Sequence, residues 1–409
     1  MNRLNHLTRV AAFGALVGLA ACESKRIVLG PTTPAGGDIF TSYVALGNSI
    51  TAGYQSGGIN DSTQRQSFAR LLAIQMGTQY HYASLQGRGC APPIANGLTG
   101  ALYGTGSTAA TCDLRAGASV TDVLNNVAVP GALVLDPTST STVASNALTT
   151  FILGGKTQVA KALDAQPTFA TIWIGNNDVL KAGLSGILVP SPYSPGIVST
   201  LAQFQTSYDA MIAQLIAGAP AIKGVLIGVV QVSGLPSMVS GGLIASSATI
   251  KATLSAAAGT AVTVHPNCTG STSLIDVPQL LLAIRSGSHP ALVACVANTV
   301  PGTVVGDLFV LDATEQATLS AAINAYNGYI AAKAAAIGFA YYDPNPLFKA
   351  QQTSGVIPAF PNFASTTATY GTLISLDGVH PTAAAHKLIA NDLMTTINTK
   401  YGTALALIP

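Results

Sequence analysis

The chain has 409 residues, of which 49% are hydrophobic and 8% are charged, and its net charge is +2. A chain of this length can bury a large core in one domain with insertions or in two smaller domains. So few charges exclude the basic field that holds a polyanion, and we expect no nucleic-acid partner. The apolar residues are scattered among Gly, Ser and Thr, which indicates a globular protein.

Residues 1–22 have the pattern of a secretory signal. Arg3 and Arg9 form a positive region before an apolar run over residues 10–20. A run of this length is too short to span a membrane as a helix, and small residues follow it, as at a signal cleavage site. We therefore expect the chain to be exported.

The signal ends in Leu-Ala-Ala directly before Cys22. This ending resembles a bacterial lipobox, and the resemblance implies that Cys22 is lipidated, becomes the first residue of the mature protein and anchors it to a membrane. Glu23 follows the cysteine, which in such signals favours the outer membrane. We expect a lipoprotein of the cell envelope that faces the periplasm or the surface; an ordinary buried cysteine is the alternative. Residues 23–40 are rich in Gly and Pro, which predicts a flexible tether.

Four further cysteines are an even number in a chain that we expect to be exported, so disulfides are expected. They are Cys90, Cys112, Cys268 and Cys295. Four cysteines allow three connectivities, and proximity in the sequence favours Cys90 with Cys112 and Cys268 with Cys295. The spacing lacks the close pairs with histidines that bind zinc, so we expect no metal site built from these cysteines. The sequence implies no metal or organic cofactor elsewhere.

The first element of the folded part is an apolar run over residues 43–46, which breaks into Gly47, Asn48 and Ser49. This pattern predicts a strand that leads into a tight turn. A serine there has its hydroxyl outside the carboxyl end of a sheet, where backbone N–H groups of the turn point as well. Ser49 is therefore a candidate nucleophile, and ordinary turn chemistry is the alternative.

Strand-like and helix-like segments alternate along the rest of the chain. Apolar runs predict strands over residues 122–129, 168–174, 225–230 and 339–343. Helical spacing of apolar residues predicts helices over residues 66–76, 151–165, 200–217, 314–336 and 381–398. This alternation indicates a parallel sheet covered on both faces. Residues 233–307 lose the alternation and are predicted to be an insertion.

A nucleophilic serine needs a base to take its proton. Among the histidines outside the signal, His380 has an acid three residues before it, Asp377, and a predicted helix after it. In such a short turn the carboxylate can fix the imidazole tautomer while the other ring nitrogen faces the serine. A surface pair of Asp377 and His380 is the alternative.

The reaction also needs donors for an oxyanion at the ends of neighbouring strands. Gly131 follows a predicted strand and can offer a backbone N–H, Asn177 can offer its side-chain amide, and Ser49 supplies its own N–H. A plain turn glycine and an Asx-turn are the alternatives for the first two. We expect the neighbouring Asp178 to be a structural hydrogen-bond acceptor.

The order of four short blocks resembles the SGNH (GDSL-type) hydrolase family. The blocks are residues 47–49, 126–131, 175–178 and 377–380. The resemblance covers residues 41–399 without the insertion and implies a three-layer α/β/α flavodoxin-like fold with a parallel sheet. It also implies the site roles: Ser49 as nucleophile, His380 as base, Asp377 as the acid that orients it, and Gly131 and Asn177 beside the Ser49 amide in the oxyanion hole. Asn48 stands where the family usually has Asp, so we expect altered bonding in the turn.

The resemblance implies a serine carboxylic-ester hydrolase, an esterase or lipase that works through an acyl-enzyme, in a domain of residues 41–409. An O-deacetylase for polysaccharide or peptidoglycan esters is one alternative, and a non-catalytic surface-binding lipoprotein is another. The expected partners are an ester substrate, small or lipid, and a membrane through Cys22. Apolar residues 280–284 of the insertion either line an acyl site or pack in a core. The sequence leaves the oligomeric state open.

Overall fold

The computed structural model describes residues 37–97, 100–104, 115, 123–140, 147–186, 188, 198–296 and 309–409. The predicted signal with Cys22, most of the predicted tether, and Cys112 lie outside the described residues. Among the helices of the described part, none is long and apolar enough to cross a membrane.

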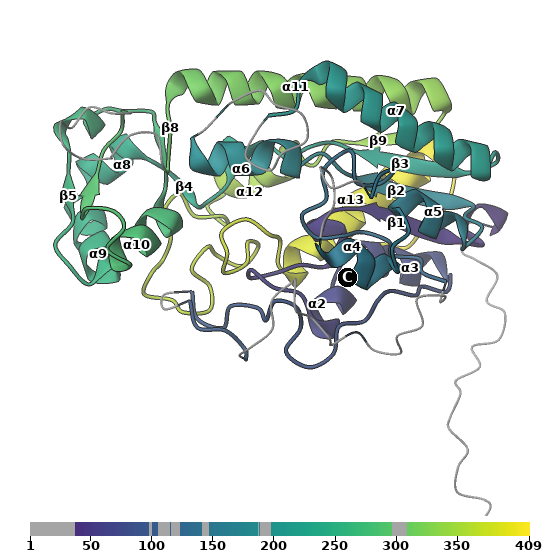
Figure 1. The fold of residues 1–409 in the computed structure, drawn as a ribbon, viewed down its shortest axis with the longest axis horizontal. Coiled ribbons are helices and arrows are strands. Elements are labelled where there is room, and N and C mark those ends of the chain that lie inside the picture. The colour runs from purple at the N-terminus through teal and green to yellow at the C-terminus, as the bar shows by residue number, and fades with distance from the viewer. Residues whose placement is uncertain are drawn as a thin grey trace, which may run out of the picture. The chain divides into compact units, whose positions relative to one another are not determined.

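A four-stranded parallel sheet lies at the centre of the fold (Figure 1). Its strands, in spatial order, are β1 (Tyr43–Gly47), β2 (Phe169–Trp173), β3 (Lys223–Ile227) and β9 (Ala340–Tyr342). The register places Gly47 opposite Trp173 and Ile227 opposite Tyr342, so the carboxyl ends of the strands lie at one edge. Almost every strand residue is buried, as in parallel sheets that are covered on both faces.

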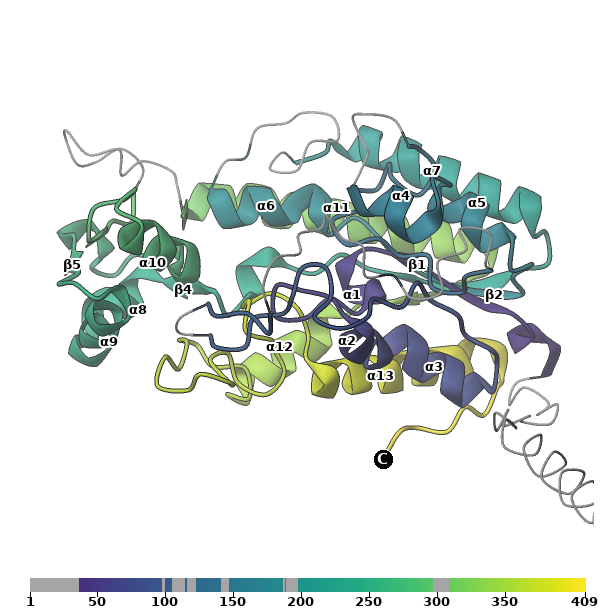
Figure 2. The same cartoon turned by 60° about the horizontal axis from the view of Figure 1, so that its bottom comes forward.

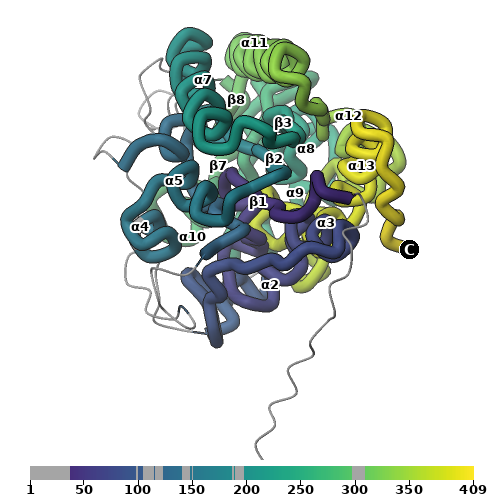
Figure 3. The backbone as a smooth tube through the Cα atoms, turned by 90° about the vertical axis from the view of Figure 1, so that its right-hand side faces the viewer, coloured from purple at the N-terminus to yellow at the C-terminus, as the bar shows by residue number. Residues whose placement is uncertain are grey.

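Helices cover both faces of this sheet, and the end-on view separates the layers (Figure 3). One face packs against α4 (Ala147–Leu153), α5 (Gln158–Leu163), α6 (Asn177–Ser185), α7 (Leu201–Gly218) and α11 (Ala313–Ile337). The other face packs against α3 (Phe68–Met76) and α13 (Ala383–Tyr401). The fold is the predicted three-layer α/β/α class.

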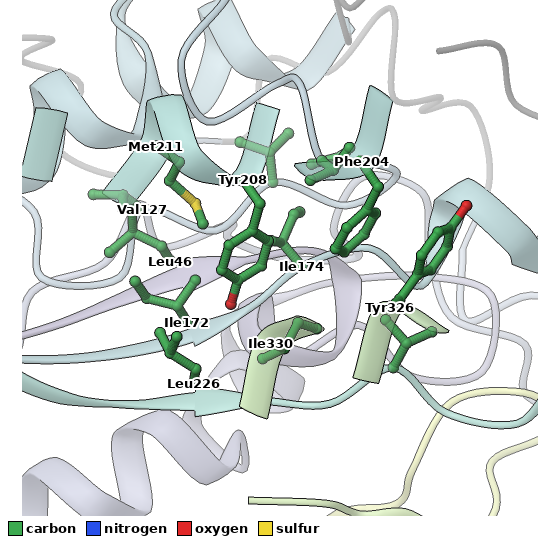
Figure 4. Close-up of a cluster of buried hydrophobic side chains, with 14 of the residues drawn as sticks. Leu46, Val127, Ile172, Ile174, Phe204, Tyr208, Met211, Leu226, Tyr326 and Ile330 are labelled. Atoms are coloured by element: carbon green, nitrogen blue, oxygen red, sulfur yellow. The ribbon is translucent and has the colours of Figure 1, made fainter. Parts of the chain in front are cut away.

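The core under α7 and α11 joins aromatic rings to the aliphatic side chains of the strands (Figure 4). The rings of Phe204 and Tyr326 stack with their centroids 4.1 Å apart, and Tyr208 stacks on Phe204. The predicted helix over residues 314–336 is confirmed as α11, with its apolar stripe buried. The Asp312 side chain caps this helix and Gly338 ends it.

Two predicted elements were wrong in part. The predicted strand over residues 122–129 pairs only through isolated bridges, from Asn126 to Ala45 and to Tyr82. Its backbone bonds with β1 are interrupted at Gly47, whose N–H donates to the Gln158 side chain. The predicted helix over residues 151–165 is two helices, α4 and α5.

The break between α4 and α5 has a local cause. Gly154 and Gly155 both adopt positive φ angles, which a right-handed helix cannot continue through. The side chain of Thr157 then accepts a hydrogen bond from the N–H of Ala160 and starts α5.

The segment that follows β3 folds around a separate apolar core (Figure 2). It contains α8 (Gly241–Ser246), α9 (Ala248–Ala258) and α10 (Val277–Arg285). Its short strands are β4 (Met238–Ser240), β5 (Thr263–Val264), β6 (Leu274–Asp276), β7 (Leu292–Val293) and β8 (Val310–Leu311). The predicted disulfide between Cys268 and Cys295 is present. Apolar residues of the 280–284 stretch pack into this core, with Leu282 exposed.

The remaining helices are short. The described part also contains α1 (Ser49–Ala52), α2 (Asp61–Arg65), α12 (Asn345–Thr353) and three 3₁₀ turns, η1 (Gly37–Phe40), η2 (Val232–Gly234) and η3 (Pro266–Cys268). Of these, α1, α12 and η2 border the candidate site.

Candidate active site

Ser49 is the first residue of α1, directly after the carboxyl end of β1. Asn48 is the N-cap, and its Oδ1 accepts a hydrogen bond from the N–H of Ile50 at 3.2 Å. Glycine is required at position 47, because a Cβ at this residue would lie 2.5 Å from both Thr51 Oγ1 and the Trp173 carbonyl oxygen. The tight packing of α1 on the end of β1 therefore fixes the backbone position of Ser49.

The structure brings Ser49, His380 and Asp377 together, although they come from opposite ends of the chain. His380 Nε2 lies 2.8 Å from Ser49 Oγ, and His380 Nδ1 lies 2.8 Å from Asp377 Oδ2. Ser49 is 8% exposed as a whole residue, and it lines the cavity described below. A proton can pass along this line from the hydroxyl to the imidazole, with the carboxylate fixing the tautomer.

Asp377 is held as a carboxylate by its own turn and by a second segment. Its Oδ1 accepts from the N–H groups of Val379 and His380, both at 2.9 Å, and its Oδ2 accepts from Gly57 N at 2.7 Å. Burial alone would raise the pKa of Asp377. The charge and hydrogen bonds of His380 outweigh burial, with help from the Val379 N–H, and lower the pKa to about 2.

The turn over residues 54–58 supports both Asp377 and His380, and the sequence reading missed it. The Tyr54 ring packs against the His380 imidazole with 4.8 Å between centroids, and the Tyr54 hydroxyl donates to the Gly57 carbonyl. Ser56 adopts a left-handed φ of 53°, and its N–H donates to Ser375 Oγ at 2.8 Å. The Gly57-Gly58 doublet is the sequence signal that marks this turn.

The predicted oxyanion donors Gly131 and Asn177 lie on segments that one hydrogen bond joins, and of the two only Asn177 lines the cavity described below. Gly131 has a φ of 81° after Pro130, and Ala132 N donates to the Val129 carbonyl at 3.1 Å, as in a type II turn. No hydrogen bond of the Gly131 N–H to another described residue is found. Asn177 Nδ2 donates to the Ala132 carbonyl at 2.9 Å, which leaves its second N–H for another acceptor.

Asp178 is a structural acceptor in the described fold. Its carboxylate accepts from Val134 N and from Ser199 Oγ, each at 2.9 Å. Nearby, Asp136 accepts from Leu133 N at 2.6 Å. Burial raises the pKa of Asp178 to about 7, and burial together with the charge of Asp178 raises the pKa of Asp136 to about 7. These carboxyl groups hold the segment that follows Gly131.

A cavity of about 580 Å³ is lined by Ser49, Asn177 and His380. Its other walls come from the segment 230–236 and from one face of α12, neither of which the sequence reading identified. Six of its apolar wall residues are Leu180, Val230, Val232, Phe348, Ile357 and Ile374.

Several polar side chains in the cavity wall bond to the protein itself. Gln231 Nε2 donates to Asn324 Oδ1, Asn345 Oδ1 accepts from Gln231 N, and Gln352 donates to the Gly234 carbonyl. The wall also contains Asp343 and Lys349, but most of the surface that it offers a ligand is apolar. The described residues contain no group of three or more His, Cys, Asp or Glu side chains that could hold a metal ion.

Comparisons with known proteins place most of the chain in one family. A model of the family described as GDSL-like lipase/acylhydrolase matches residues 43–393, from β1 into α13. Among solved structures, an extracellular lipase from Streptomyces rimosus is similar with 16% identity over 87% of this chain and 99% of that chain, at a TM-score of 0.34. No curated protein matches the chain.

Proposed function

Because the chain belongs to the GDSL-like lipase/acylhydrolase family and is an ester-hydrolysing enzyme, we propose that it hydrolyses carboxylic esters through Ser49, His380 and Asp377. The observation that carries this proposal is the unbroken line of hydrogen bonds from Ser49 Oγ through His380 to Asp377. Family membership argues against the alternative of a non-catalytic binding lipoprotein.

In this mechanism Ser49 Oγ attacks the ester carbonyl carbon while His380 Nε2 takes the hydroxyl proton. Asp377 accepts the Nδ1–H and stabilises the imidazolium that forms. The tetrahedral oxyanion accepts hydrogen bonds from Ser49 N–H, Gly131 N–H and Asn177 Nδ2. The carbon–oxygen bond to the alcohol then breaks, and His380 gives the alcohol its proton.

The acyl-enzyme is hydrolysed by the same groups in reverse roles. His380 takes a proton from a water molecule, the water oxygen attacks the acyl carbon, and Ser49 leaves with the proton from His380. The products are the free acid and the restored serine. The low pKa of Asp377 keeps its carboxylate ionised at neutral pH.

The cavity favours an acyl chain over a sugar as the group bound beside Ser49. Its wall is mainly apolar, and Phe348 is its only aromatic residue other than His380 among the residues that line it. A cavity of about 580 Å³ falls in the range of small-molecule sites and leaves room for a chain rather than an acetyl group alone. This supports an acyl esterase or lipase over the O-deacetylase alternative.

The experiment is hydrolysis of p-nitrophenyl esters from acetate to palmitate by residues 23–409, with Ser49→Ala and Ser246→Ala as paired variants. Ser246 is an exposed serine on α8, and its replacement is expected to leave turnover unchanged. We expect turnover that requires Ser49 and that is faster for a chain longer than acetate. A preference for acetate would favour the deacetylase, and turnover retained in Ser49→Ala would overturn the proposed mechanism.

We further propose that Cys22 anchors the enzyme to a membrane of the cell envelope. The support is the apolar signal over residues 10–20 and the Leu-Ala-Ala sequence before the cysteine. The expressed full-length chain is expected to incorporate labelled palmitate and to sediment with membranes, and Cys22→Ser is expected to lose both. Labelling that persists in Cys22→Ser would contradict the anchor.

A further inference from the structure

Gln158, the first residue of α5, places its carboxamide against the last residue of β1. Its Oε1 accepts from the Gly47 N–H at 2.9 Å, and its Nε2 donates to the Gly47 carbonyl at 2.9 Å. The side chain is 1% exposed. One buried amide therefore holds both backbone polar groups of the residue that precedes Asn48 and Ser49.

These bonds interrupt a parallel ladder at a particular place. The segment 125–129 runs beside β1: Ala45 N donates to Asn125 O at 2.7 Å, Val127 N donates to Ala45 O at 3.0 Å, and Val129 N donates to Gly47 O at 3.1 Å. A regular parallel ladder would next send the Gly47 N–H to the Val127 carbonyl. Gln158 Oε1 takes that N–H instead, so the amide is inserted between the two segments.

Both segments leave the sheet directly after this point. Beyond Gly47, β1 turns into Asn48 and Ser49, while the segment 125–129 turns at Pro130 into Gly131. The Gly47 carbonyl accepts from Gln158 Nε2 and from Val129 N, so it ties both turns to the same amide. The position of the Gly131 turn relative to the Ser49 turn therefore depends on the size and bonding of the inserted side chain.

We infer that Gln158 is a positioning residue that sets the placement of the Gly131 N–H relative to Ser49 Oγ. The inference rests on the proposed function, in which these two groups hold the oxyanion and attack the ester. A carboxamide suits the task because it donates and accepts at once and carries no charge in a buried place. Methionine has a similar length, cannot donate and accepts only weakly.

The chain offers a matched control in Gln64. This side chain is 6% exposed, its Nε2 donates to Ala83 O at 2.9 Å, and its Oε1 accepts from Leu85 N at 2.9 Å. It therefore makes the same two bonds to backbone as Gln158, but to a segment that carries none of the proposed catalytic groups. Gln158→Met and Gln64→Met are expected to lower the melting temperature by similar amounts.

Only Gln158→Met is expected to lose catalysis. We expect kcat on a p-nitrophenyl ester to fall by about tenfold to a hundredfold with little change in KM, since a displaced oxyanion donor acts in the transition state. In the Asn177→Ala background the same substitution is expected to have a smaller effect, because both changes act on the oxyanion. Should Gln158→Met not fold, Gln158→Asn and Gln64→Asn make the same comparison with a shorter amide.

Two outcomes would overturn the inference while leaving the proposed function standing. In the first, wild-type hydrolysis requires Ser49 but Gln158→Met and Gln64→Met have the same kcat. In the second, Gln158→Met and Asn177→Ala lower kcat independently, so that the double variant loses the product of the two single losses. Wild-type hydrolysis that does not require Ser49 would instead overturn the proposed function, and the inference with it.

Discussion

The sheet domain and the insertion between β3 and α11 are built in different ways. Around the site, side chains that come from distant parts of the chain bond directly to backbone: Gln158 to Gly47, Asn177 to Ala132 and Asp377 to Gly57. The insertion is closed instead by an apolar core, to which Phe363 from after α12 contributes, and by the Cys268–Cys295 disulfide.

The two regions therefore meet different requirements. The site needs its reacting groups placed accurately, whereas the insertion needs only to be stable. Apolar packing stabilises a fold but tolerates small shifts, whereas a reacting group displaced by about 1 Å can lose a hundredfold in rate. The insertion gives the cavity only residues near its start, such as Leu235 and Pro236. Substitutions at the site should therefore lower the rate of ester hydrolysis, whereas substitutions in the insertion should lower its stability.

The largest effect is expected from His380→Ala. Without the imidazole, Ser49 has no base within hydrogen-bond distance among the described residues, so kcat is expected to fall by roughly four orders of magnitude. End-point assays at high enzyme concentration measure the residual rate of ester hydrolysis. His81→Ala, at an exposed histidine, serves as the control and is expected to keep wild-type turnover. A His380→Ala rate within tenfold of the wild type would contradict the assignment of the base.

Asn177→Ala is expected to have the next largest effect. It removes one proposed oxyanion donor and the bond to the Ala132 carbonyl, so kcat is expected to fall by about a hundredfold or more while KM changes little. Steady-state kinetics on one ester give both constants. An unchanged kcat with a raised KM would show that Asn177 only binds the substrate.

Removing the disulfide is expected to affect the insertion and spare the chemistry. Cys268→Ser with Cys295→Ser is expected to destabilise the insertion by about 3 kcal/mol through the entropy of the opened loop. Hydrogen exchange is expected to rise in residues 238–296, while kcat on the acetate ester stays within about twofold of wild type. If kcat fell and hydrogen exchange rose in the central sheet as well, the insertion and the site would not be independent.

The smallest effect is expected from Asp136→Asn, and it depends on pH. Burial and the Asp178 charge raise the folded-state pKa of Asp136 from 3.8 to about 7, so folding binds a proton between these values. The folded state therefore loses stability as the pH rises from about 4 to 7 and keeps that deficit above 7.

The uncharged amide avoids this loss, because it needs no proton to stay neutral. Asp136→Asn is expected to be more stable than the wild type at pH 8, by on the order of 2 kcal/mol. The advantage should shrink toward pH 4. Denaturant unfolding at three pH values measures it. An advantage that is constant with pH, or that grows toward pH 4, would show that Asp136 is not the buried acid responsible.

The sequence predicts those parts of the fold that leave a periodic or local pattern. The buried stripe of α11 and the apolar runs of β1, β2 and β3 each follow from spacing within one segment. Ser49, Asp377 and His380 also lie in short blocks with recognisable order, so the sequence alone identifies them as candidates.

Other parts of the site have no such pattern. Gln158 acts through two bonds to a residue 111 positions away, and Gly57 donates to a carboxylate 320 positions away. Helix α12 lines the cavity, although none of its residues is buried. Asp136 resembles any loop acid until burial raises its pKa. Such features depend on which segments meet in space, and a single sequence does not encode that locally.

The most direct test of the account is the mass of the protein after reaction with a p-nitrophenyl alkylphosphonate, followed by peptide mapping. We predict one adduct per chain, located on Ser49, absent in Ser49→Ala and formed far more slowly in His380→Ala. An adduct on another residue, or no adduct in an enzyme that still hydrolyses esters, would contradict the claim that Ser49 is the nucleophile of this site.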